Sequence, residues 1–344
     1  MHIVIAIFCI WLVSRLLGGL ARRLKQPAIV GELLTGLLLG PSLLGRYYSF
    51  TSPFLDGLVL VGTALFLLTA GWGIRLSEIL IYRRLGLAVS LAGVLVPFTI
   101  GYVLGSGYPN LAGYDGLSSM SLFAVFLGIA LSVSALPVIA RTLMDLGLYR
   151  SRIGVITMSA ATIDDLLGWT CFSLLLSFFG HMSLRSQLIF FLPLACYVIG
   201  VLIGEVNDRR HAKVKHAVDR AVQAVFAPIV FGSIALKLSF IQNFDLRLVL
   251  VLVLAASTGK VFGCFLAARA MHIPRRESWA VGFAMNSRGA MMIILASLAW
   301  QLHVIGDRLV VGLIAMAVVT SLMSAPLIRW ALKKETIVGA EQIR

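Results

Sequence analysis

The stretch from Ser151 to Trp169 reads SRIGVITMSAATIDDLLGW and decides the class of fold. It is apolar on both sides of two adjacent carboxylates, Asp164 and Asp165. Consecutive positions on an α-helix diverge by about 100°, so the two carboxylates cannot point into one small pocket in the same way. One carboxylate can bind an ion while the other meets a partner. Charges inside an apolar span are costly, and they are functional or tightly paired by default.

The rest of the chain is as apolar as this stretch. Of its 344 residues, 59% are hydrophobic and 13% are charged, and the mean hydropathy is +0.96. A hydrocarbon layer about 30 Å thick takes roughly 20 apolar residues per helix, and helices satisfy their own backbone polar groups in lipid. We therefore expect an all-α, polytopic integral membrane protein whose helices contact the lipid bilayer.

Eleven apolar windows predict about eleven transmembrane helices. They fall at 2–20, 27–45, 57–74, 85–105, 118–141, 153–179, 186–204, 221–239, 247–269, 278–301 and 309–331. The first window follows only Met1 and His2 and lacks a basic n-region, so it is interpreted as a span rather than a signal peptide.

The charges of the loops predict the orientation. When the loops alternate between the two sides, 21 of the 29 basic residues fall on one side and five on the other. The richer side is cytoplasmic by the positive-inside rule, which predicts an external N-terminus and a cytoplasmic C-terminus in the cell (inner) membrane. The same excess explains the net charge of +14 without a nucleic-acid partner. The four cysteines lack ligand-like spacing and are expected to be free.

One transmembrane domain is predicted over residues 1–344. Its first half runs to about 180, a connector covers about 181–220, and its second half covers about 221–335. The hydrophilic stretch from Glu205 to Arg220 interleaves charged residues with Ala and Val. It is either an amphipathic helix at the membrane interface or a solvated loop.

Lys260 is the predicted partner of the aspartate pair. It lies in Ala255-Ala-Ser-Thr-Gly-Lys-Val-Phe-Gly, near the centre of its own span. An unpaired ammonium there would lose its proton, whereas a neighbouring carboxylate would hold it charged. Glu32 is the third acid within the spans, only a turn or two inside the cytoplasmic face. It either guards an ion entrance or reaches back to water.

The fifth predicted span is interrupted. Residues 131–141 read LSVSALPVIAR, in which Pro137 cannot donate to the helix ladder. Ser132 and Ser134 can offer hydroxyl oxygens to a cation.

The tenth predicted span is interrupted in the same way. Residues 283–291 read FAMNSRGAM, which places Asn286, Ser287, Arg288 and Gly289 in mid-span. Unwound backbone at membrane depth lines cavities, and such interruptions in corresponding spans of two halves indicate a transport site. Arg288 is expected to neutralise helix C-terminal dipoles where the two broken helices cross.

These segments together resemble the monovalent cation:proton antiporter-2 family, whose membrane domain is sodium/hydrogen exchanger-like. The matching motifs run in order along the chain as Gln26-Pro, Gly31-Glu32, Gly36, Gly40-Pro41-Ser42, Ser132-Val-Ser-Ala-Leu-Pro137-Val, Ser159-Ala-Ala-Thr-Ile-Asp164-Asp165, Gly259-Lys260 and Asn286-Ser-Arg288-Gly289.

The resemblance implies an inverted-repeat fold. A core with two crossed discontinuous helices is then expected to move against a dimerisation domain. The resemblance also implies that Asp165 binds a cation or a proton in turn and that Asp164 faces Lys260. The residues that support the helix crossover would be Pro137, Asn286, Ser287 and Arg288.

The sequence departs from the family in two places. Gly71-Trp72-Gly73-Ile74-Arg75 lacks both acidic positions of the usual turn after the third span. One span, instead of three, separates the aspartate helix from the span that contains Ala227. Losing an even number of spans keeps the two core halves inverted. The resemblance implies that the missing pair comes from the dimerisation side, where the family's usual homodimer would form.

The predicted function is secondary transport that exchanges sodium or potassium for protons, with no cofactor and no enzymatic chemistry. Asp165 would alternate between a proton and a dehydrated cation, helped by Ser132, Ser134 and backbone carbonyls. The alternatives are a transport-dead relative that acts as a sensor or scaffold, a cation channel, and a sodium-coupled symporter on a related fold. Adjacent aspartates without a Gly-x-Gly-Asp motif argue against an intramembrane aspartyl protease.

Overall fold

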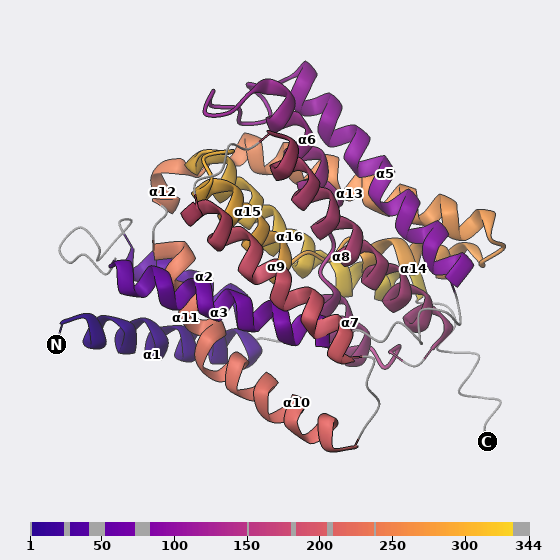
Figure 1. The fold of residues 1–344 in the computed structure, drawn as a ribbon. Helices are drawn as coiled ribbons and strands as arrows, with labels where there is room; N and C mark the ends of the chain where they lie inside the picture. Colours follow the sequence, from indigo (N-terminus) through magenta and orange to yellow (C-terminus); the bar gives the residue numbers. More distant parts are fainter. Residues whose placement is uncertain are drawn as a thin grey trace. The chain divides into compact units, whose positions relative to one another are not determined.

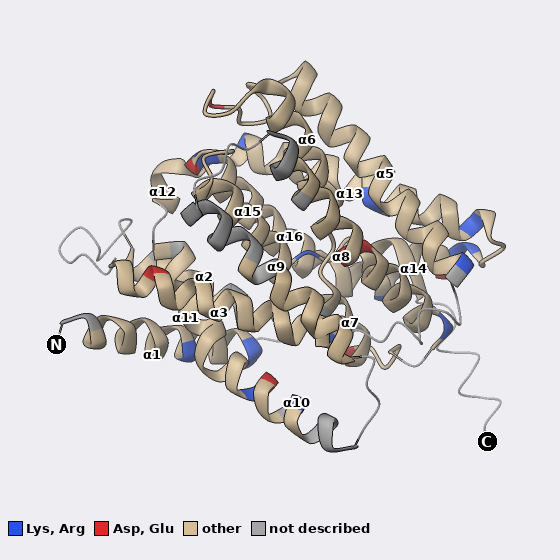
Figure 2. Cartoon of the chain, viewed as in Figure 1, with Lys and Arg blue, Asp and Glu red and all other residues tan. Residues whose placement is uncertain are grey.

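The computed structural model describes residues 2–23, 28–40, 52–72, 83–149, 151–179, 184–204, 209–236 and 239–332. These residues form helices and turns, with no strand among them. Each of the eleven predicted windows overlaps a helix (Figure 1). Charged residues colour only short parts of the helix ribbons (Figure 2). The fold is therefore the all-α, polytopic fold that the composition predicts.

Length and hydropathy identify the helices that can cross a bilayer. Among the described residues six helices qualify, and a bent pair at 275–301 makes up to seven. The six are Val4–Arg23, Pro53–Trp72, Arg84–Gly107, Ala217–Ile234, Leu246–Ala270 and Asp307–Leu332. The remaining windows coincide with other helices, so the total of eleven spans stays a prediction.

The helices group into two compact units, and each unit takes segments from both halves of the chain. Unit 1 consists of Met1–Ser77, His181–Phe244 and Trp300–Leu302. Unit 2 consists of Glu78–Gly180, Asp245–Ala299 and His303–Arg344. The two halves predicted from the sequence, about 1–180 and 221–335, each contribute to both units.

Unit 1 is built from helices near the start and the middle of the chain. They are α1 (His2–Arg23), α2 (Ala28–Leu39), α3 (Pro53–Trp72), α9 (Leu184–Gly204), α10 (Arg209–Ala221), the π-helix η2 (Val222–Phe226), α11 (Ala227–Leu236) and α12 (Phe240–Asn243). Helix α1 packs on α2, α2 on α11, and α3 on α9. A Cβ atom at Gly71 would overlap the carbonyl oxygen of Tyr197, and one at Gly200 would overlap that of Leu68. These glycines allow the backbones of α3 and α9 to approach closely, as small residues do between membrane helices.

The hydrophilic connector is helical where it is described. Of the two interpretations of Glu205 to Arg220, the helix agrees with α10, which covers the part from Arg209 onward. Residues 205–208 lie outside the described residues. Between α8 and α10 the described part of the chain contains one long helix, α9, where the family resemblance leads us to expect three spans.

Unit 2 repeats one pattern twice: a long helix, two short helices separated by a break, and another long helix. The first copy is α5 (Arg83–Gly107), α6 (Met120–Ser132), α7 (Leu136–Asp145) and α8 (Arg152–Phe179). The second copy is α13 (Leu246–Ala270), α14 (Arg275–Met285), α15 (Ala290–Gln301) and α16 (Asp307–Leu332). The copies correspond to predicted spans 4–6 and 9–11. Because this offset of five is odd, the predicted topology gives them opposite orientations.

The two discontinuous helices have local causes in the sequence. Val133 and Ala135 are extended between α6 and α7, and Pro137 lies in the first turn of α7. A proline there removes no helix hydrogen bond, because the first N–H groups of a helix have no intrahelical acceptor. The second break covers Asn286 to Gly289, and α14 and α15 differ in direction by 40°.

Several residues on which the sequence predictions rest lie outside the described residues. They are Lys25, Arg46, Arg75, Arg150, Lys237, Lys333, Lys334 and Arg344 among the loop charges, and Gln26-Pro27, Pro41-Ser42 and Gly73 to Arg75 among the family motifs.

Candidate functional site

Asp164 and Asp165 lie in the middle of α8 and are both buried. Asp164 is 1% exposed and Asp165 is 3% exposed. Helix α8 packs against α5, α6, α7 and α14 of the same unit. The two carboxylates diverge around the helix, as adjacent positions must. Their surroundings therefore differ, and this difference is the main feature of the site.

Asp164 accepts hydrogen bonds from three other elements. Lys260 on α13 forms a fully buried ion pair with its Oδ2 atom. Ser134, in the break between α6 and α7, lies with its Oγ atom 2.8 Å from the same oxygen. Ser90 on α5 lies with its Oγ atom 3.2 Å from Oδ1. A buried carboxylate needs such partners to offset the loss of its hydration.

Asp165 presents the opposite situation. Its Oδ1 atom is buried and has no hydrogen-bond partner among the described residues. A buried acceptor without a partner costs about 1–3 kcal/mol, and more for a charged group. Such an atom is stable in a membrane protein when a proton or a cation neutralises it. Of the two carboxylates, Asp165 therefore has the unused capacity for a ligand.

The two breaks cross each other beside Asp164. The amide N–H of Ala135 donates to the carbonyl of Ser287 at 3.0 Å, and the Ser134 hydroxyl lies 2.7 Å from the carbonyl oxygen of Met285. A Cβ atom on Gly289 would lie 2.5 Å from the side chain of Val138. The absence of a side chain at Gly289 allows this close approach.

Two buried cationic side chains donate hydrogen bonds to the carbonyl groups at the C-terminal end of α6. The last carbonyls of a helix have no intrahelical donor. Arg288 is fully buried and donates to the carbonyls of Ala130, Leu131 and Val133. Lys260 donates to the carbonyl of Ser132 as well as to Asp164. The same lysine thus joins the aspartate network to the end of the broken helix.

The two predicted serines lie close to Asp164. Among the described residues, neither hydroxyl forms a hydrogen bond with Asp165. Ser132 donates to backbone carbonyls, with Gly128 O at 2.7 Å and Val94 O at 3.0 Å. The Ser134 hydroxyl has Asp164 and Met285 as its acceptors. A hydroxyl that donates its single hydrogen still has lone pairs available for a cation. The role of both serines as cation ligands therefore stays a prediction.

In the second break, some polar side-chain atoms form hydrogen bonds and others do not, within the residues that the structure describes. Asn286 donates to the Ser257 hydroxyl at 3.0 Å, while its Oδ1 atom has no partner among the described residues. The hydroxyl of Ser287 is buried and likewise unpartnered within the described part of the chain. Ser321 on α16 donates to the carbonyl of Arg288 and so links the break to α16.

A small cavity lies against Asp164. It is lined by residues of α5, α6 and α8 that include Val94, Ser132, Asp164, Gly168 and Cys171. Its volume is about 10 Å³, which is close to the least space that holds one water molecule. Polar atoms and water-sized space thus occur together at the aspartate helix.

The sequence alone does not distinguish Ser90, Ser257 or Ser321 as members of this network. Each is a serine in an otherwise apolar helix, and nothing in the local spacing separates it from a serine that bonds its own helix. Their partners lie 74, 29 and 33 positions away in the chain. Only the packing of the helices reveals them.

Glu32 and the cysteines are the remaining candidate residues. Glu32 on α2 belongs to unit 1 and is 7% exposed. The four cysteines are free, as their spacing predicts. Among the described residues no group of three or more His, Cys, Asp and Glu side chains could hold a metal ion.

Comparison with known proteins adds a family and a fold. The profile of the family described as "Sodium/hydrogen exchanger, transmembrane" matches residues 10–194 and 192–334. The two matched segments meet inside α9, the helix that stands alone between α8 and α10 in the described part of the chain.

The chain is similar to antiporters of plants and bacteria. It is 27% identical to the Cation/H(+) antiporter 17 of Arabidopsis thaliana, covering 95% of this chain and 48% of that protein. The chain thus spans about half the length of this plant relative. It is 24% identical to the Na(+)/H(+) antiporter NhaS4 of Synechocystis, covering 92% of this chain and 93% of the relative. It is 25% identical to the Na(+)/H(+)-K(+) antiporter GerN of Bacillus cereus, covering 93% and 94%.

A solved structure shows the same fold. The sodium proton antiporter MjNhaP1 from Methanocaldococcus jannaschii matches with a TM-score of 0.65 and 14% sequence identity. The match covers 97% of this chain and 99% of that one.

Proposed function

Because the chain belongs to the sodium/hydrogen exchanger transmembrane family, we propose that it exchanges a monovalent cation, sodium or potassium, for protons across the membrane. Two relatives that match more than nine-tenths of the chain, NhaS4 and GerN, are named as antiporters of these ions. Protons and monovalent cations are then its substrates, and the reaction needs only binding and conformational change.

One observation carries the assignment of the site. Asp164 is engaged by Lys260, Ser134 and Ser90, whereas a buried oxygen of Asp165 has no partner among the described residues. A carboxylate already paired with a lysine is poorly suited to release and rebind an ion. We therefore assign the alternating binding of cation and proton to Asp165.

Competition for Asp165 couples the two ions. Either a proton or a dehydrated cation neutralises the carboxylate, and neutralisation lowers the cost of carrying the site through the hydrocarbon. The cation would find further oxygen ligands in Ser132, Ser134 and backbone carbonyls of the breaks. A charged, empty site would move reluctantly, which suppresses leak.

The Lys260–Asp164 pair would set the charge moved in each cycle. If cation binding at Asp165 releases Lys260 from Asp164, the lysine can lose its proton to the other side. Two protons would then exchange for one cation, and transport would respond to membrane voltage. Pro137, Asn286, Ser287 and Arg288 would hold the crossover in the geometry that this exchange needs.

The placement in the cell follows from the loop charges. We propose the cell (inner) membrane, with the N-terminus external and the C-terminus cytoplasmic. A homodimer stays a prediction, because the family resemblance puts dimerisation on the side that has lost a pair of spans.

Proton flux in liposomes tests the proposal. The purified chain would be reconstituted with a pH-sensitive dye inside, a pH gradient imposed, and sodium, potassium, lithium or choline added in turn. Sodium or potassium should dissipate the gradient, and choline should not. If no alkali cation exceeded choline, the chain would be a transport-dead relative. A current far above transporter turnover would instead indicate a channel.

A further inference from the structure

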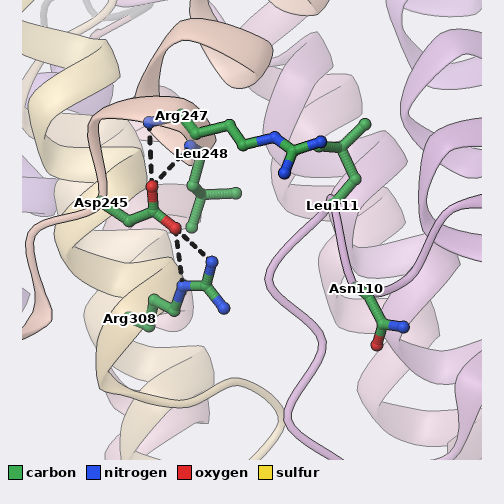
Figure 3. A pocket seen from close by; sticks show the side chains of 6 residues that line it. All are labelled: Asn110, Leu111, Asp245, Arg247, Leu248 and Arg308. Carbon is green, nitrogen blue, oxygen red and sulfur yellow. Dashed lines mark hydrogen bonds and ion pairs between the residues drawn. The ribbon is translucent and has the colours of Figure 1, made fainter.

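A second polar pocket lies at one end of unit 2, away from the aspartate helix. It is lined by Asn110 and Leu111 from the loop after α5, by Asp245, Arg247 and Leu248 at the start of α13, and by Arg308 in the first turn of α16. In Figure 3 the Arg247 side chain extends from the start of α13 toward the loop that carries Leu111. Arg308 reaches Asp245 from α16.

The single carboxylate of the pocket is already neutralised. Asp245 caps α13 by accepting from the amide N–H groups of Arg247 at 2.9 Å and Leu248 at 3.2 Å. Its other oxygen accepts from Arg308, with the Nε atom at 3.0 Å. The guanidinium of Arg247 has no hydrogen-bond or ion-pair partner among the described residues. The pocket therefore carries an uncompensated positive charge.

The size and the donors of the pocket favour a tetrahedral anion. Its volume is about 200 Å³, several times the roughly 30 Å³ that a water molecule occupies in the liquid. An arginine presents its N–H groups as a planar fork that matches phosphate. Arg308 uses Nε and Nη2 for Asp245, so its Nη1 atom remains available. Asn110 lines the same pocket from the loop after α5.

The position of the pocket favours a lipid as the source of the phosphate. It lies where α13 and α16, both long enough and apolar enough to span a bilayer, begin. Leu246, Leu250 and Leu254 follow one another at helical spacing on α13 and are 60%, 52% and 63% exposed. This stripe offers an apolar surface for acyl chains directly beside Arg247. Basic charge beside an apolar helix face is the combination that a phospholipid, with its phosphate and its acyl chains, requires.

We propose that this pocket binds a phosphate group, supplied by the headgroup of a phospholipid or as free phosphate. The site is independent of the proposed ion exchange, because it shares no residue with the aspartate network. It touches α13, which carries Lys260, and α16, which carries Ser321. Occupancy would thus brace the ends of two helices that contribute to that network.

Binding measurements on the purified full chain test this site in two arms. In the first, native mass spectrometry counts bound phosphatidylglycerol against diacylglycerol, which lacks the phosphate. In the second, inorganic phosphate replaces chloride at constant ionic strength while the thermal unfolding midpoint is followed, since a ligand of the folded state raises it. The variants are Arg247→Gln and Asn110→Asp, and Arg276→Gln is the matched control. Arg276 is an exposed arginine at the start of α14 and does not line the pocket.

The expected result is a loss of about tenfold in phosphatidylglycerol affinity in Arg247→Gln, the scale of one charge-assisted hydrogen bond. Asn110→Asp should lose as much, because it adds a repelling charge, and Arg276→Gln should stay within about twofold. A midpoint rise with inorganic phosphate alone, lost in the same two variants, would support the site with free phosphate as its ligand. If Arg247→Gln bound like Arg276→Gln in both arms, the site would be refuted.

Discussion

Lys260 on α13 donates both to Asp164 on α8 and to the carbonyl of Ser132 at the end of α6. A single ammonium group therefore links three elements of unit 2, and every participant is buried. One position along the helix, the Oδ1 atom of Asp165 is buried and has no hydrogen-bond partner in the described part of the chain.

Removing the lysine should destabilise the protein and change its response to voltage. In Lys260→Ala, Asp164 is left buried without its counter-charge, and removing one partner of a buried pair costs about 3–5 kcal/mol. Any exchange that remains should lose its sensitivity to an imposed potential. Thermal unfolding and proton flux under a diffusion potential measure the two effects.

The double variant Lys260→Met with Asp164→Asn is the control for this prediction. Replacing both charges removes the uncompensated carboxylate, so most of the lost stability should return. Voltage-sensitive exchange in Lys260→Ala, or a wild type indifferent to voltage, would refute the charge-coupling role of the pair.

The two serines of the first break should affect cation affinity more than maximal rate. Replacing both Ser132 and Ser134 by Ala removes neutral oxygen ligands but no titrating group. We expect the half-saturating cation concentration to rise by about tenfold, the scale of two neutral hydrogen-bonding groups at about 0.7 kcal/mol each. Proton flux as a function of cation concentration gives both parameters. Unchanged affinity for every alkali cation would place the ligands elsewhere.

Arg288 should be needed for the stability of the crossover rather than for charge alone. Arg288→Lys keeps the positive charge but cannot supply two nitrogens to the carbonyls of Ala130, Leu131 and Val133. We expect it to lower the free energy of unfolding by about 2–4 kcal/mol, because buried carbonyls lose their donors. Arg152→Gln, an exposed arginine at the start of α8, is the matched control. Equal unfolding midpoints for the two variants would contradict the role.

Asp245, which lies just before α13, should make the stability of the protein depend on pH. Its hydrogen bond with Arg308, followed by that from the amide of Leu248, holds the pKa of Asp245 below its usual range. A depressed pKa in the folded state gives stability that is complete above the unfolded pKa, about 3.9, and is lost as pH falls through the folded value. Asp245→Asn should therefore be less stable at neutral pH, by about 1 kcal/mol or less because both partners are partly exposed.

Unfolding curves of Asp245→Asn and wild type between neutral and acidic pH check the sign. The gap in stability should shrink as pH falls below about 4. A gap that stayed constant or widened in acid would contradict the assignment.

The sequence predicts the elements of the site better than their contacts. Hydropathy locates the helices, because the bilayer imposes length and polarity on each segment separately. Pro137 and the Asn286–Gly289 stretch locate the breaks, since their effects are local to the backbone. The partners of Asp164 required the packed structure: Ser90 has no distinguishing pattern. Nor does the sequence order reveal that α5–α8 and α13–α16 join in one compact unit while α9 joins α3 in the other.

Cation-dependent proton flux by Asp165→Asn in liposomes tests directly whether Asp165 is the exchanging carboxylate. The amide can neither accept the exchanged proton nor supply the charge that the cation needs. Asp145→Asn, at an exposed carboxylate paired with Arg141, is the matched control. We expect flux at the level of empty liposomes for Asp165→Asn, wild-type flux for Asp145→Asn, and an intact unfolding transition for both. Wild-type flux from folded Asp165→Asn would contradict Asp165 as the exchanging carboxylate.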